Sequence, residues 1–508
     1  MVKNRLQVQV QKALFAIFFI ANSAVVPTVA MAQASLPTLG DGNELTTSAE
    51  RKVGERIIRE LYRDPDYIDD ALLQEYVQGI FASLVEAAKA RGELSPEIEE
   101  RFAWEILLGR DRSVNAFALP GGYLGVHLGL IGVVSSRDEL ASVMAHELSH
   151  VTQRHIARLL TQQSRQTPLM LGAMVLGALA ASKSPAAAQA LIVGGPALAA
   201  QTQLNFSRDM EREADRLGYG LMEPAGFAPE GFVAMFDKLQ QANRLNDNGS
   251  WPYLRSHPLT TQRIADMHAR LPPGQSGAAS AGTAEHAMLA ARARVLSRPG
   301  VDVLRQWAGE PAGGGFAAQP LPKRAGGWYA AVLAEMQLRN FEAARKHIAP
   351  LLAAVQGDAA ATRQAQMLKA ELELQAGQPQ AALEALPPLQ GQARPELVLR
   401  TQVLLRLGQA AQVTGALQTW LVSHPRDATM WQLLGAAWQQ QGQPLRAVRA
   451  DAEAQAARYD YAAAVDRFKA GQEMARKGGA QSDYIEASII DTRLREMESR
   501  LREQAAER

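Results

Sequence analysis

The sequence contains no cysteine, and this absence removes three kinds of site at once. Without a thiol the chain cannot form a disulfide, bind a metal through thiolate ligands or use a cysteine nucleophile. Any metal ion must therefore be held by histidine, aspartate or glutamate side chains.

A surplus of either charge is also lacking. The 508 residues include 53 Lys plus Arg and 52 Asp plus Glu, which gives a formal net charge of +1. Nucleic-acid-binding proteins usually carry a basic surplus, so this balance argues against a nucleic-acid partner. Apolar residues make up 47% of the chain, which is enough for sizeable folded cores. At about 100–200 residues per domain, the length predicts two to four domains.

A long uninterrupted apolar run is missing from the N-terminal region. Three basic residues among the first twelve precede residues 13–30, which are mostly apolar but interrupted by polar residues and a proline. The longest apolar run is about nine residues, against about 20 for a membrane span. The Ala-Met-Ala sequence at 30–32 has the small residues that a signal peptidase needs. Residues 1–32 are therefore predicted to be a cleaved export signal, with an uncleaved membrane anchor as the alternative.

The pattern that follows predicts helices and then a small sheet. Residues 50–100 have apolar positions at helical spacing, whereas residues 102–108 and 113–126 alternate between turn signals. This alternation predicts a β-meander or a hairpin. A long helical pattern over residues 139–160 comes next. Ser136 is its expected N-cap, because a glutamate stands three residues later.

A second apolar zone covers residues 169–200 and is split by a Lys-Ser-Pro sequence at 183–185. Each half is shorter than a transmembrane helix requires. The composition favours a packed helical hairpin rich in alanine and glycine. A surface that touches a membrane or a partner is the alternative, because exposed apolar patches mark such sites.

The C-terminal part of the chain contains a recurring helix–turn–helix phrase. It follows residues 272–284, whose composition is typical of a flexible linker. The phrase has its turns at Asn340, Gly377, Gly408 and Gly442, which are 37, 31 and 34 residues apart. A period near 34 is typical of the tetratricopeptide repeat, which stacks into a superhelix with a concave face. Residues 285–508 are thus predicted to form an α-solenoid, with a generic helical bundle as the alternative.

The strongest chemical signal is the sequence His146-Glu147-Leu148-Ser149-His150. On a helix, residues four apart lie one turn apart on the same face. Both imidazoles can then bind one Zn²⁺ ion, and Glu147 is suited to take a proton from water. This spacing within a helical pattern predicts a metallopeptidase site.

A catalytic zinc ion needs a third protein ligand. The chain lacks the extended motif with a third histidine, because position 156 is isoleucine. Glu211 and Asp215 share one helical face, whereas Glu213 lies about 200° around the helix from Glu211. We therefore expect Glu211 to bind the metal and Asp215 to hydrogen-bond a zinc-binding histidine. A solvated acidic helix face is the alternative.

His257 and Arg263 could also act at this site, whereas a further histidine, His155, is not expected to. His257 stands in a loop next to Pro258 and could bind the metal or stabilise a developing oxyanion. His155 lies five residues beyond His150, on a different helical face, and is predicted to be at the surface. Arg263 could contact substrate or brace the loop.

These motifs resemble the M48 family of zinc metallopeptidases, in which HExxH is followed by ExxxD, and the attached repeats resemble its periplasmic branch. The resemblance implies a mainly α protein, with an α+β zincin-type peptidase domain at 33–271 followed by tetratricopeptide-like repeats at 285–508. It implies one Zn²⁺ per chain bound by His146, His150 and Glu211, with Glu147 as the catalytic base. It also implies that His257 can fill the fourth zinc position and hold the enzyme off.

The resemblance further implies a role in outer-membrane protein assembly. The expected enzyme is a periplasmic endopeptidase that degrades misassembled outer-membrane proteins, with chaperone activity besides. Its expected partners are the β-barrel assembly machinery and unfolded or stalled outer-membrane proteins. The alternative is a chaperone or adaptor that acts mainly through its repeats while the protease is largely silent.

Overall fold

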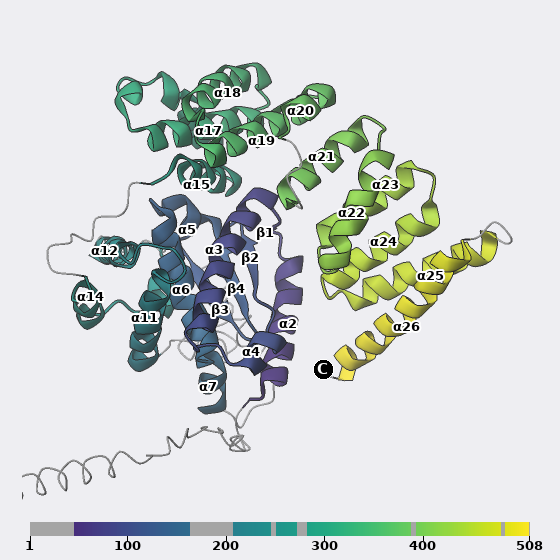
Figure 1. Cartoon of the computed structure of the whole chain (residues 1–508), viewed down its shortest axis with the longest axis horizontal. Coiled ribbons are helices and arrows are strands. Elements are labelled where there is room, and N and C mark those ends of the chain that lie inside the picture. The colour runs from purple at the N-terminus through teal and green to yellow at the C-terminus, as the bar shows by residue number, and fades with distance from the viewer. Residues whose placement is uncertain are drawn as a thin grey trace, which may run out of the picture. The chain divides into compact units, whose positions relative to one another are not determined.

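The computed structural model describes residues 45–162, 207–244, 250–271, 282–387, 393–478 and 483–506. They belong to one compact unit that spans Leu45–Arg508, and Figure 1 labels most of its elements. The predicted export signal, the apolar segment at 169–200 and most of the predicted linker lie outside the described residues.

A small mixed sheet has the strand order β1-β2-β4-β3. The strands are β1 (Tyr67–Ile68), β2 (Glu105–Gly109), β3 (Ala116–Leu119) and β4 (Tyr123–His127). The predicted hairpin is present, because β3 and β4 pair antiparallel around Gly121 and Gly122, whose positive φ angles suit glycine. The alternative of a meander is wrong, because β2 pairs parallel with β4. The chain crosses past β4 to reach β3, which forms one edge of the sheet.

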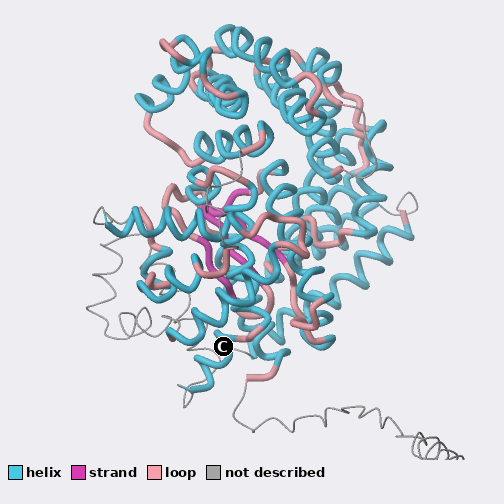
Figure 2. The backbone as a smooth tube through the Cα atoms, turned by 60° about the vertical axis from the view of Figure 1, so that its left-hand side comes forward, coloured by secondary structure: helices cyan, strands magenta, loops and turns pink. Residues whose placement is uncertain are grey.

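Helices surround this sheet, as the magenta strands enclosed by cyan tubes in Figure 2 show. The helices of this part of the chain are α2 (Thr47–Arg63), α3 (Ala71–Ala90), α4 (Pro96–Arg101), α5 (Leu128–Val133), α6 (Arg137–Thr152), α7 (His155–Gln162), α11 (Arg208–Met222), α12 (Glu230–Arg244), α13 (Tyr253–Ser256) and α14 (Thr261–His268). Helix α6 packs against α3, α11, α12 and β3, and residues 139–152 are all buried. Helix α6 is therefore the central helix of this part of the chain.

The sequence pattern predicted the start of α6 correctly but not its end. The predicted N-cap is confirmed, because the Ser136 side chain accepts a hydrogen bond from the Glu139 N–H at 3.2 Å. The predicted continuation to residue 160 is wrong, because α6 ends at Thr152 and α7 begins at His155. Arg154 between them has a φ of 52°, and a residue in this left-handed conformation interrupts a right-handed helix.

The C-terminal part consists of helical hairpins in succession. Its helices are α15 (Ala284–Leu296), α16 (Val301–Gly309), η1 (Glu310–Ala312), η2 (Phe316–Ala318), α17 (Leu321–Gln337), α18 (Phe341–Val355), α19 (Ala359–Gln375), α20 (Pro379–Ala385), α21 (Arg394–Arg406), α22 (Ala411–Ser423), α23 (Ala428–Gln440), α24 (Pro444–Ala457), α25 (Tyr461–Gly478) and α26 (Tyr484–Ala506). The four predicted turns are confirmed, since each separates two helices. A residue with positive φ stands at every one of them: Arg339, Gly377, Gly408 and Gly442. The predicted fold class, an α+β domain followed by helical repeats, is also confirmed.

The two parts share buried contacts. Leu289 and Ala293 of α15, together with Met367 and Val403 of the repeats, belong to the same apolar cluster as the residues around α6. Arg394 at the start of α21 also forms paired hydrogen bonds of 2.9 and 2.7 Å with Asp69, which precedes α3. The repeats are thus joined to the N-terminal part by apolar packing and by charge.

Within the ranges that the structure describes, no helix combines the length and the apolar composition needed to cross a membrane.

Candidate metal centre and active site

His146 and His150 are presented by the same face of α6. Both side chains are buried, and their Nε2 atoms lie 3.0 Å apart. The helical spacing of four residues brings the two rings together, as the sequence motif predicts. Two imidazole nitrogens are therefore aimed at one point inside the protein.

Glu211 reaches the same point from α11. This helix is capped by Ser207, and Gly218 allows it to approach α6 closely, because a Cβ at this position would lie 3.0 Å from the carbonyl carbon of Ala145. The carboxylate oxygens of Glu211 lie 3.5 Å from His146 Nε2 and 3.4 Å from His150 Nε2. The close helix packing thus brings the acid to the two histidines.

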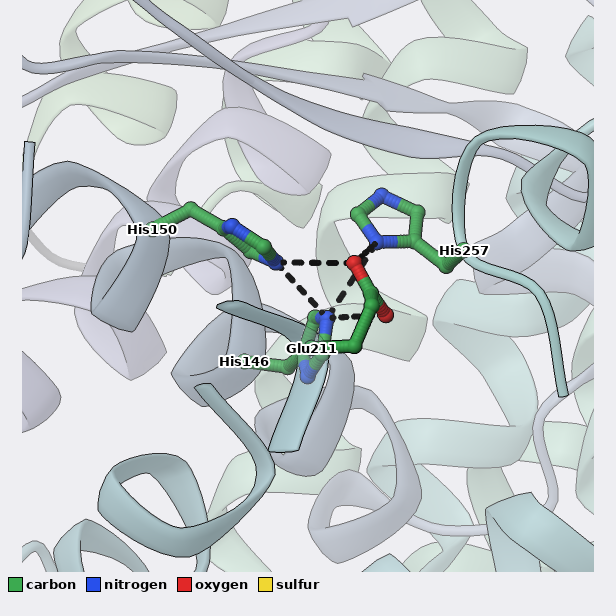
Figure 3. A group of neighbouring side chains, drawn as sticks. All are labelled: His146, His150, Glu211 and His257. Carbon is green, nitrogen blue, oxygen red and sulfur yellow. Dashed lines mark hydrogen bonds and ion pairs between the residues drawn. The ribbon is translucent and has the colours of Figure 1, made fainter. Parts of the chain in front are cut away.

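His257 completes the group. It is the first residue of the loop between α13 and α14. Its Nδ1 atom lies 2.9 Å from Glu211 Oε1 and 3.3 Å from His146 Nε2. The ring stacks on Tyr253, with 4.5 Å between ring centroids, and the side chain is buried. Figure 3 shows the four side chains pointing toward one another from two helices and this loop.

The spacing of these atoms fits a single metal ion. One ligand atom from each of His146, His150, Glu211 and His257 lies within 4.8 Å of the others. A tetrahedral zinc ion with ligands at about 2.0–2.1 Å separates its ligand atoms by about 3.3 Å. Five separations between neighbouring atoms of the group, counting both oxygens of Glu211, are 2.9–3.5 Å and lie around that value. Three imidazoles and a carboxylate are also ligands that zinc prefers, so the residues present fit the ion.

Asp215 and Arg263 hold the outer side of this group. Asp215 Oδ1 lies 3.0 Å from His146 Nδ1, and Arg263 donates two hydrogen bonds to the Asp215 carboxylate, at 2.6 and 2.8 Å. Burial raises the pKa of Asp215, but the hydrogen bonds from Arg263 and His146 outweigh it and leave the pKa below its usual value.

Arg263 also bonds the Pro258 carbonyl oxygen at 2.9 Å and lies 2.7 Å from Glu211 Oε2. Of the two roles that the sequence left open for Arg263, these contacts correspond to bracing the His257 loop.

Glu147 lies beside the metal group with its two oxygens in different surroundings. Glu147 Oε2 accepts a hydrogen bond from the Ala118 N–H of β3 at 2.9 Å. Glu147 Oε1 is buried without a hydrogen-bond partner in the described part of the chain, and His257 Nε2 lies 3.3 Å from it. One oxygen is therefore anchored to the edge strand while the other faces the histidines.

The prediction that His155 lies at the surface is wrong. Its side chain is fully buried, and its two ring nitrogens contact His150 and Glu213. Burial lowers the pKa of His155 although Glu213 opposes this effect, so the ring is neutral at neutral pH. The sequence pattern missed this residue because it predicted an unbroken helix, which would have turned His155 away from His150.

Comparison with known proteins identifies the family. Residues 71–271 match the model of peptidase family M48. The beta-barrel assembly-enhancing protease of Escherichia coli K12 is 30% identical over 499 residues, which cover 94% of this chain and 95% of that protein. A Vibrio cholerae protein named "putative beta-barrel assembly-enhancing protease" is 36% identical over 237 residues, which cover 46% of this chain and 47% of that protein.

The mitochondrial metalloendopeptidase OMA1 of Saccharomyces cerevisiae is more distant. It is 28% identical over 201 residues, which are 39% of this chain and 55% of that protein. The full-length similarity to the E. coli protein and the match of residues 71–271 agree with the buried metal group described above. The chain therefore belongs to peptidase family M48 and is a zinc metalloendopeptidase.

Proposed function

We propose that this chain is a gated zinc endopeptidase of outer-membrane protein quality control. The single observation that carries the proposal is the buried convergence of His146, His150, Glu211 and His257 beside Glu147. Within it, His146, His150 and Glu211 are the proposed metal ligands, and Glu147 is the proposed catalytic base. Asp215 is the proposed partner that orients His146.

The chemistry assigned to each group follows from its contacts. Zinc, when bound, acts as a Lewis acid that polarises the scissile carbonyl and makes water more acidic. The role of Glu147 is to hold that water and to take its proton, and later to deliver the proton to the departing amine. The hydrogen bond from Ala118 fixes one carboxylate oxygen, which leaves Glu147 Oε1 to accept the proton.

His257 is the proposed gate of the site. Its Nδ1 atom lies among the ligand atoms, and its Nε2 atom faces the proposed base. While the imidazole stays there, it occupies the space that water and a carbonyl oxygen need. His257 belongs to the short loop between α13 and α14, so the proposed opening moves this loop, and it must break the contact of His257 with Glu211 on α11. Oxyanion stabilisation is the competing role, and it predicts the opposite effect of substitution.

The proposed substrates are extended polypeptide segments that pair with strand β3. The strand is an edge of the sheet, and one of its N–H groups already contacts Glu147. A substrate that adds to such an edge is held mainly by backbone hydrogen bonds, so many sequences are accepted. This mode suits the removal of unfolded or stalled proteins.

The cellular role is proposed from the relatives and from the chain's organisation. A beta-barrel assembly-enhancing protease covers nearly the full length of this chain. We assign residues 1–32 to an export signal, 33–271 to the peptidase part, 272–284 to a linker and 285–508 to the repeats. The location is then the periplasm, and the repeats are the proposed contact with the β-barrel assembly machinery.

The experiment that tests this function compares Glu147→Gln with the unchanged protein in cells and in vitro. We expect the variant to bind zinc but to leave an unfolded outer-membrane protein intact. If the variant restores every cellular phenotype of a deletion strain, the chaperone or adaptor activity is the main function instead.

A further inference from the structure

The break between α6 and α7 allows His155 to contact His150, which it could not do in a continuous helix. In an unbroken α-helix, a residue five positions later is rotated by about 140° from the first. Arg154 adopts a left-handed conformation, which changes the direction of the chain after α6. With this change, the His155 ring contacts the His150 ring. The Arg154 side chain holds the break through a 2.9 Å hydrogen bond to Glu50 and a bond to the Leu45 carbonyl oxygen.

A chain of hydrogen bonds then connects the proposed ligand His150 to Glu213. His150 Nδ1 lies 2.9 Å from His155 Nδ1, and His155 Nε2 lies 3.0 Å from Glu213 Oε2. Arg158 donates a hydrogen bond of 3.3 Å to the same oxygen of Glu213. The buried imidazole of His155 is therefore held at both of its nitrogens.

The direction of these hydrogen bonds follows from the acceptor at the end of the chain. An ionised carboxylate only accepts, so His155 Nε2 carries the proton and His155 Nδ1 presents a lone pair. His150 Nδ1 must then donate, which leaves the lone pair of His150 on Nε2. That atom is the one that faces His146 and Glu211.

We propose that His155 and Glu213 are positioning residues that fix the tautomer and orientation of His150 for metal binding. This inference rests on the proposed function of the site, since it assigns a partner to a proposed zinc ligand. His146 has Asp215 as its direct carboxylate partner. His150 is supported instead by an imidazole that a carboxylate orients. Removing either member weakens zinc binding without removing a ligand.

The test measures zinc affinity by competition with a chelator, and the visible absorption spectrum of the cobalt(II)-substituted protein. His155→Phe retains the ring volume but offers no acceptor, and we expect it to weaken zinc binding about 10–100-fold and to alter the cobalt spectrum. Glu213→Ala is expected to weaken binding less, because Glu213 is partly exposed. Glu213→Gln retains an acceptor oxygen and should fall between Glu213→Ala and the unchanged protein.

Asp209→Asn is the matched control, because it removes the same charge from α11 where the side chain pairs only with Arg212 among the described contacts. Thermal unfolding of the metal-free proteins shows whether each variant folds. If His155→Phe is unfolded, the two Glu213 variants carry the test alone. If the folded variants have unchanged zinc affinity and an unchanged cobalt spectrum, His155 and Glu213 do not position His150 and the proposal is overturned. If the unchanged protein itself binds no zinc at this group, the proposed function fails instead.

Discussion

The peptidase part and the repeats bury their charged groups in different ways. In the peptidase part, seven buried ionisable groups converge on one point: His146, Glu147, His150, Glu211, Asp215, His257 and Arg263. In the repeats, each of several buried carboxylates has its own arginine from a neighbouring helix: Glu373 with Arg345, Glu396 with Arg363, Glu453 with Arg493 and Glu486 with Arg449. The convergent group in the peptidase part forms one reactive site. The separate ion pairs of the repeats form the same stabilising contact several times along the array.

This difference predicts how the two regions respond to substitution. A change in the convergent group should remove metal or activity while most of the fold remains, because several neighbours hold each side chain. A change in a repeat pair should lower stability and leave the metal in place, because a buried charge loses its partner but neither side chain belongs to the metal group. The following substitutions test both halves of this statement.

Glu147→Gln should have the largest effect. Glutamine preserves the shape of the side chain but cannot take a proton from water, so cleavage of an unfolded protein should fall by about 10²–10⁴-fold. The zinc content, measured by atomic absorption, should stay at one per chain. A variant that retains full activity would show that Glu147 is not the base.

His257→Ala tests the gate by the sign of its effect. Removal of an imidazole that fills the fourth position should raise proteolysis of flexible substrates, with zinc still bound. If His257 instead stabilises the oxyanion, its removal should lower the cleavage rate by about 10²–10³-fold. The measurement is the initial cleavage rate of an unfolded substrate at matched zinc content, and a rate below that of the unchanged protein contradicts the gate.

Asp215→Ala should weaken zinc binding by about 10–100-fold, because His146 loses the acceptor that orients it. Arg263 would also lose its two hydrogen bonds to Asp215. Competition with a chelator measures the change, and Asp209→Asn on the same helix is the control. Equal zinc affinity in the two variants would mean that Asp215 does not act through His146.

These expectations depend unequally on the sequence. The pairing of His146 with His150, and of Glu211 with Asp215, could be predicted because the helical period alone brings residues four apart to one face. The repeat turns could be predicted because glycine and asparagine mark them. Such features are local, so the chain's own spacing contains the necessary information.

Other features depend on contacts between distant segments. The parallel pairing of β2 with β4 follows from how the sheet closes, which alternation within one strand does not reveal. The break at Arg154 escaped the sequence pattern because a non-glycine residue adopts the left-handed conformation there. His257 lies 111 residues from His146, so its place in a loop could only suggest a metal ligand or an oxyanion donor, and the fourth zinc position came from the family resemblance.

Arg345→Ala should have the smallest effect on the site. Arg345 donates hydrogen bonds of 3.0 and 2.7 Å to the buried carboxylate of Glu373, and their loss should lower the free energy of unfolding by about 1–3 kcal/mol. Zinc content and proteolysis should not change. Arg305→Ala, which breaks an exposed pair with Asp302, should alter the unfolding free energy by less than about 0.5 kcal/mol. Chemical denaturation measures both, and a loss of zinc in Arg345→Ala would contradict the division between the regions.

The most direct test of the central claim is a crystal structure of the zinc-loaded protein with anomalous diffraction recorded on both sides of the zinc absorption edge. We predict one zinc peak per chain among His146, His150 and Glu211, with His257 in the fourth position when no substrate is bound. A zinc peak elsewhere, or full zinc occupancy with Glu211 turned away from the ion, would contradict the account.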